Sequence, residues 1–98
     1  MRLFTNAMMK SNIFIIHPSD NVGIALKSLN SKDRISNGEE VLFDAGEPIP
    51  VFHKVALQDI AVGEEIYKYG AVIAVSSKPI KKGDWVHTHN LEGARWHK

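Results

Sequence analysis

The feature that most constrains this chain is that its apolar residues come in short segments, each ended by residues that favour turns. Residues 13–16 (IFII) are rich in β-branched side chains, which predicts a buried strand. Residues 17–21 (HPSDN) follow and favour a turn, and residues 41–44 predict another short strand. No segment has the length and period of a long helix. We therefore expect a compact, mostly β fold with short strands, long loops and little helix.

The second half of the chain alternates more regularly between apolar and polar residues. Residues 51–58, 64–69 and 84–89 alternate as strands with one buried face do. Residues 71–75 (AVIAV) are apolar on both faces, which predicts a strand inside the fold. Residues 22–29 fit one face of a helix as well as they fit a strand, so the sequence leaves this segment open.

A weak internal repeat links two parts of the second half. Residues 59–66 (DIAVGEEI) are echoed 20 positions later by residues 79–86 (PIKKGDWV). Each copy has an isoleucine, two residues, a glycine, an acid, one residue and a β-branched aliphatic side chain. Two copies are too few for a solenoid, which needs about three or more. The repeat predicts two similar turns, each led by a buried isoleucine, in which Gly63 and Gly83 supply a positive φ.

Length and composition limit the functions that the chain can have. Its 98 residues suit one domain, for which we expect the boundaries 13–91, an extension at 1–12 and a tail at 92–98. Met8 or Met9 could be the true start. The net charge is +1, from 12 basic and 11 acidic residues, so no nucleic-acid partner is expected. Cysteine is absent, which excludes disulfides, thiolate nucleophiles and cysteine-ligated zinc.

The apolar runs also bear on location and partners. The run at residues 13–16 is too short for a signal peptide or a membrane span, so we expect a cytoplasmic protein that binds no membrane. A chain this small buries a modest core, so a partner chain or a homo-oligomer could add to its stability. No nucleophile with a base, no phosphate loop and no usefully spaced carboxylate pair is visible. This favours part of an enzyme over a complete one.

His87 and His89 are the sharpest candidates for chemistry. On a strand, positions i and i+2 point to the same face, a few ångströms apart. Two such imidazoles can share a metal ion or flank an anionic substrate. They could equally be two solvated side chains at a polar strand end. Trp85, on the same face, is expected to fill the edge of the core beneath them.

Other candidates lie at strand ends and loops. His17 ends a predicted strand, and Asp20 could orient its imidazole or instead cap the following turn. His53 falls on the apolar face of a predicted strand, where a histidine is more often a core residue than a catalyst. Lys54 then points the opposite way and is expected to be exposed. Lys68 could reach a substrate carboxylate or remain a surface lysine.

Four short motifs together carry a resemblance to a known family. They are residues 17–22 (HPSDNV), 53–60 (HKVALQDI), 68–70 (KYG) and 85–90 (WVHTHN), in that order. They resemble the small SAF domain that opens the altronate and galactarate dehydratases. The separate small subunit of sulfolactate sulfo-lyase belongs to the same group. The likeness runs over residues 13–91, which is most of the chain.

The resemblance implies a β-clip fold and a lyase that removes water or sulfite from a 2-hydroxy acid. It implies a divalent metal, commonly iron, and a larger catalytic domain or subunit as partner. It also points to substrate binding, for an anionic sugar acid, by a set of loop and strand-end residues. These are His17, Asp20, Asn21, His53, Lys54 and Lys68. A non-catalytic SAF module that binds a carbohydrate or anion is the alternative of another class.

Two positions depart from the family's pattern. Phe52 and Ala74 stand where the family usually has glycine. A side chain at either position would crowd a tight turn or a close backbone approach. The departures bear on which member of the family this is, and they leave the expected fold unchanged.

Overall fold

The computed structural model describes residues 11–93 and confirms a mostly β fold with short strands. In this part the only helix is η1 (Thr88–Asn90), a single 3₁₀ turn. No helix of the described part is long and apolar enough to cross a membrane. The strands are β1 (Ile13–Phe14), β2 (Val22–Ala25), β3 (Arg34–Asn37), β4 (Glu40–Asp44), β5 (Lys54–Ala56), β6 (Glu65–Lys68), β7 (Ala71–Ser76), β8 (Trp85–Val86) and β9 (Leu91–Gly93).

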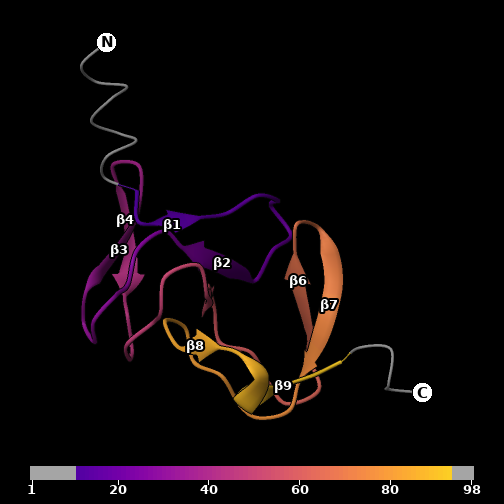
Figure 1. Ribbon diagram of the computed structural model, residues 1–98. Coiled ribbons are helices and arrows are strands. Elements are labelled where there is room, and N and C mark those ends of the chain that lie inside the picture. The colour runs from indigo at the N-terminus through magenta and orange to yellow at the C-terminus, as the bar shows by residue number, and fades with distance from the viewer. Residues whose placement is uncertain (1–10, 94–98) are drawn as a thin grey trace.

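The strands form three small antiparallel sheets. The largest has the order β1-β2-β5-β8 and lies between the other two in Figure 1. The hairpin β3-β4 flanks it on one side, and the sheet β6-β7-β9 flanks it on the other. Both hairpins contain a register shift, one between Ile35 and Ser36 and one between Ile66 and Tyr67. Such bulges bend short strands and increase their twist.

Four similar turns connect these strands. A buried aliphatic residue precedes each turn, and these residues form two antiparallel bridges, Leu29 with Ile49 and Ile60 with Ile80. The residue three positions later has a positive φ in every case. It is Lys32 (73°), Phe52 (67°), Gly63 (86°) and Gly83 (93°).

The second pair of turns, at Ile60 and Ile80, is the repeat found in the sequence, and the structure adds a first pair 31 positions earlier. Leu29 corresponds to Ile60, and Ile49 to Ile80. The register shift after Ile35 likewise corresponds to the one after Ile66. Each half of the fold is thus a turn, a hairpin, a second turn and a strand of the largest sheet.

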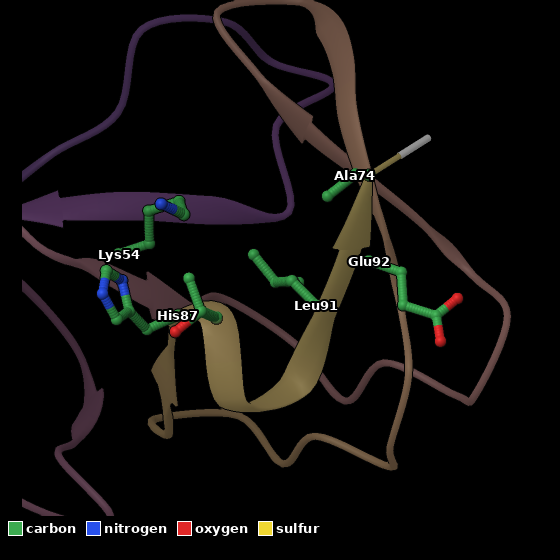
Figure 2. Close-up of a pocket in the computed structure, with 7 residues that line it drawn as sticks. Lys54, Ala74, His87, Leu91 and Glu92 are labelled. Atoms are coloured by element: carbon green, nitrogen blue, oxygen red, sulfur yellow. The ribbon is translucent and has the colours of Figure 1, made fainter. Parts of the chain in front are cut away.

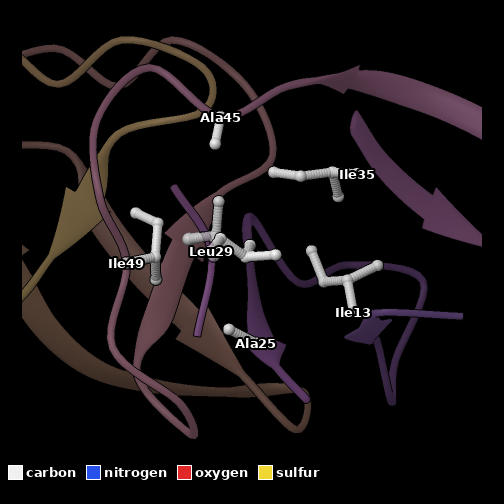
Figure 3. Packing of buried hydrophobic residues seen from close by; sticks show 7 residues of the cluster. Ile13, Ala25, Leu29, Ile35, Ala45 and Ile49 are labelled. Atoms are coloured by element: carbon white, nitrogen blue, oxygen red, sulfur yellow. The ribbon is translucent and has the colours of Figure 1, made fainter. Parts of the chain in front are cut away.

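Strand β5 joins two hydrophobic clusters. Val55 and Ala56 are both fully buried, and because successive side chains point to opposite faces, each belongs to a different cluster. The cluster that contains Val55 is shown in Figure 3 and also holds Ile13, Ala25, Leu29, Ile35, Ala45 and Ile49. The cluster that contains Ala56 also holds Val22, Ile60, Ile66, Ala74, Ile80 and Val86.

Several predicted strands are shorter or more exposed than expected. Of residues 13–16 only the first two are paired, and Ile16 is 48% exposed, so the buried strand ends early. Val51 and Phe52 lie in a turn, since Pro50 lacks the N–H that a strand would use. Residues 71–75 were expected to form a strand that is buried on both faces. This is wrong for residues 71–73, which are exposed at the start of β7, where the β6-β7 hairpin extends beyond the core. The open segment 22–29 contains strand β2.

Paired structure also continues past the expected domain boundaries. Asn12 exchanges hydrogen bonds with Ser36, and Glu92 and Gly93 pair with β7 as part of β9. The expected start at Met8 or Met9, most of the extension and the tail from residue 94 lie outside the described residues.

Candidate functional site

The pairing of β5 with β8 gathers most of the candidate site residues. Val55 lies opposite Trp85, and Lys54 lies opposite Val86. This brings the His53 ring within 4.6 Å of the His87 ring, centroid to centroid. The Trp85 ring stacks on His87 at 5.5 Å with an interplanar angle of 11°. Residues separated by more than 30 positions thus form one aromatic and basic group beside Lys54.

An open pocket of about 690 Å³ lies against this group. Lys54 and His87 line one side of it, and Ala74 and Leu91 supply apolar surface (Figure 2). Thr88 and the backbone of Gly93 complete the lining with Glu92, whose carboxylate points away from Lys54 and His87 in Figure 2. The pocket therefore has a basic side and an apolar side, an arrangement that suits a small organic anion.

On the basic side, the ionisable groups affect one another's pKa. Burial lowers the pKa of the Lys54 ammonium, and the nearby charge of Lys68 lowers it further. Burial also lowers the pKa of His87, helped by the charges of His53, Lys54 and His89. His87 is therefore a neutral imidazole at neutral pH. An anion placed here would relieve the repulsion between the two lysines.

Lys54 is half-buried and lines the pocket, so the expectation that it is exposed is wrong. That expectation assumed that the second face of the strand is open to solvent, whereas Ala56, on the same face as Lys54, is fully buried. Lys68 ends β6, and its ammonium lies 4.9 Å from the centre of the Tyr69 ring. Lys68 does not line the pocket, but its charge lowers the pKa of Lys54.

His17 lies at a different place, over the turn between β6 and β7. A Cβ added to Gly70 would meet the His17 ring at 2.9 Å, so the ring rests directly on this glycine. Nδ1 of His17 contacts the backbone N–H and the hydroxyl of Ser19, at 3.1 and 2.8 Å. Of the two alternatives for Asp20, the structure does not support the one in which its carboxylate orients this imidazole, because the contacts of Nδ1 are with Ser19.

Asp20 and Asn21 hold the loop of His17 against β6 and β7. Asp20 accepts hydrogen bonds from the backbone N–H groups of His17, Tyr69 and Gly70. Asn21 accepts one from the N–H of Tyr67 and donates one to the carbonyl of Glu65. Both side chains are buried. These contacts favour a structural role, and substrate binding by these two residues stays a prediction.

The geometry expected for a metal at His87 and His89 is wrong. The strand ends at Val86, and η1 turns the chain before His89, so the two histidines do not project from one strand face. Both rings instead contact Trp85, and His89 is exposed. Within residues 11–93 no three His, Asp or Glu side chains are grouped to hold a metal ion. Residues 11–93 therefore cannot by themselves complete a site for the divalent metal, which stays a prediction for the complete enzyme.

The sequence did not indicate two parts of this site. Trp85 packs against the core as expected, but it also donates its indole N–H to Nδ1 of His53 at 3.0 Å. No local pattern predicts a contact across 32 residues. The pocket side formed by Leu91 and Ala74 depends on β9, which has too few residues for alternation to be visible.

The two departures from the family's pattern have definite places. Phe52 adopts a positive φ of 67° and is 70% exposed, so its turn has the backbone conformation that glycine favours. Ala74 is buried, and its methyl group lines the pocket.

Comparison with known proteins shows which family this chain is similar to. The family described as the altronate/galactarate dehydratase SAF domain matches residues 11–94. The chain is 29% identical over 90 residues to the (2R)-sulfolactate sulfo-lyase subunit alpha of Chromohalobacter salexigens, covering 85% of this chain and 96% of that protein. It is 38% identical over 84 residues to altronate dehydratase of Bacillus subtilis, covering 86% of this chain. It is also 38% identical over 73 residues to galactarate dehydratase of Escherichia coli, covering 72% of this chain.

The lengths of these relatives differ greatly. The chain spans nearly all of the sulfo-lyase subunit but only 16% of the altronate dehydratase and 13% of the galactarate dehydratase.

Proposed function

The chain belongs to the SAF-domain family of the altronate and galactarate dehydratases, and from that premise we propose that it binds the acid substrate of a lyase. The substrate would be a 2-hydroxy acid, with a sugar acid as the first candidate. The chain would work beside a large catalytic domain or subunit that supplies the divalent metal and the base.

One observation carries this proposal: Lys54 and His87 form the basic side of a pocket whose other side is apolar. Burial and the charge of Lys68 both disfavour the charged form of Lys54. A bound carboxylate would stabilise that charged form by pairing with the ammonium group. His87, being neutral, can donate to or accept from a substrate hydroxyl.

The test is to replace Lys54 in the complete enzyme. Lys54→Met keeps the length of the side chain but removes its charge, and it should raise KM for the acid by about tenfold or more, the factor expected for a lost charged hydrogen bond. Lys27→Met is the matched control, since Lys27 is exposed and does not line the pocket. An unchanged KM in Lys54→Met would show that the acid binds elsewhere.

A second candidate substrate is (2R)-sulfolactate. The observation that favours it is length, since the chain covers 96% of a sulfo-lyase subunit alpha. Sulfite release from sulfolactate, measured against 2-keto acid formation from altronate or galactarate, separates the two candidates.

A further inference from the structure

In three of the four equivalent turns, an acidic side chain closes the turn. Asp33, Glu64 and Asp84 each accept a hydrogen bond from the backbone N–H three residues earlier, at 2.8, 2.6 and 3.1 Å. In the remaining turn the earlier residue is Pro50, which has no N–H, and His53 takes the place of the acid. His53 is thus free of the structural role that its three counterparts have.

His53 instead receives a hydrogen bond from Trp85. The indole Nε1–H lies 3.0 Å from Nδ1 of His53. An indole nitrogen can only donate, so Nδ1 must carry a lone pair and the proton of the neutral ring must be on Nε2. No hydrogen-bond partner is found for Nε2 of His53 within residues 11–93.

His53 lies next to the basic side of the pocket, although its own side chain does not line the pocket. His53 directly precedes Lys54, which lines the pocket, and its ring lies 4.6 Å from that of His87, which also lines it. Trp85 contacts both imidazoles, so one indole supports the two rings from β8. Rings supported in this way keep a fixed orientation.

We propose that Trp85 is a positioning residue, which holds His53 as its Nε2–H tautomer so that the ring donates a hydrogen bond to an oxygen of the acid. This inference rests on the proposed function for its ligand. The tautomer itself is a property of the chain alone and can be tested without a substrate.

The first test is the long-range ¹H–¹⁵N spectrum of the histidines in the ¹⁵N-labelled chain, without ligand. His53 should show the Nε2–H pattern in the wild type and a mixture of tautomers in Trp85→Phe. His89→Ala, which removes a different ring contact of Trp85, should leave the His53 pattern unchanged. An Nδ1–H pattern in the wild type overturns the proposal even if Trp85→Phe does not fold.

The second test is a double-mutant cycle in the complete enzyme. Trp85→Phe alone should lower kcat/KM by about fivefold to tenfold, as expected for one lost hydrogen bond. In a His53→Ala background the same change should have little further effect. Additive losses would show that Trp85 does not act through His53. If the wild-type tautomer is as expected but neither variant alters kcat/KM, the role of His53 in binding the acid is overturned. The proposed binding of the acid by Lys54 is tested separately, by the KM of Lys54→Met.

Discussion

Asp20 joins two segments that lie about 50 residues apart in the chain. Its carboxylate accepts the N–H groups of Tyr69 and Gly70 from the hairpin turn and that of His17 from its own loop. Hydrogen bonds to a charged group are worth about 1.5–3 kcal/mol each, and more is lost when donors are left buried without a partner. One side chain thus fixes the loop of His17 against Gly70.

Removing this carboxylate should destabilise the chain markedly. We expect Asp20→Ala to lower the free energy of unfolding by about 3 kcal/mol, measured by urea denaturation. Asp59→Ala is the control, because Asp59 is exposed and accepts one hydrogen bond, from the N–H of Lys82. Its effect should be below about 1 kcal/mol. Equal effects of the two variants would contradict the structural role of Asp20.

Because Asp20 titrates, the difference in the free energy of unfolding between the wild type and Asp20→Ala should depend on pH. Burial alone would raise the pKa of Asp20. The hydrogen bonds from three backbone N–H groups lower this pKa by more than burial raises it, so the pKa lies below the ordinary 3.8. The unfolded chain therefore binds more protons there, and the stabilisation is present above pH 3.8 and lost as the pH falls through the folded-state pKa. The stability difference from Asp20→Ala should narrow below pH 3.8. A constant difference would contradict this assignment.

At the scale of elements, the four turns have a common backbone but different surroundings. Gly63 and Gly83 both have a positive φ. A Cβ on Gly63 would meet nothing within 4 Å, whereas a Cβ on Gly83 would lie 2.6 Å from the carbonyl oxygen of Asp44. Gly83 thus allows the turn before β8 to approach the end of β4, and this contact orients the strand that carries Trp85.

The two glycines form a matched pair of predictions. Gly63→Ala should destabilise the chain by about 1 kcal/mol, the cost of a left-handed residue with a side chain. Gly83→Ala should cost about 3 kcal/mol or more, because the backbone must also move away from Asp44. Thermal unfolding of both variants tests this difference. Equal losses would indicate that the close approach at Gly83 does not stabilise the fold.

The sequence predicted the element types better than their limits. Alternation and turn residues identified strands β4, β6 and β7 and the pair of turns at Ile60 and Ile80, because these depend on local side-chain patterns. Strand β3 was not predicted, because its residues are mostly polar. The first pair of turns escaped notice because Lys32 and Phe52, rather than glycine, hold the positive φ. The extended strand expected at His87 and His89 failed because Asn90 accepts the N–H of His87 and turns the chain. The contact of Trp85 with His53 is tertiary, so no local pattern contains it.

At the scale of the whole molecule, the proposed function treats the pocket as one side of a shared site. The pocket is open and has a basic side and an apolar side. The relatives include both a small subunit and much longer single chains. The same family domain can therefore make up nearly all of a chain or a small part of a much longer one.

The most direct test of this account is reconstitution of activity. The rate of 2-keto acid formation from a sugar acid, and of sulfite release from sulfolactate, is measured for this chain, for the large catalytic chain produced with it and for the two together. If one polypeptide contains both, the large part is expressed without these residues. The account predicts activity from the combination alone, and a combination containing Lys54→Met should need a higher acid concentration. Full activity from either part alone would contradict the claim that this chain supplies one side of a shared site.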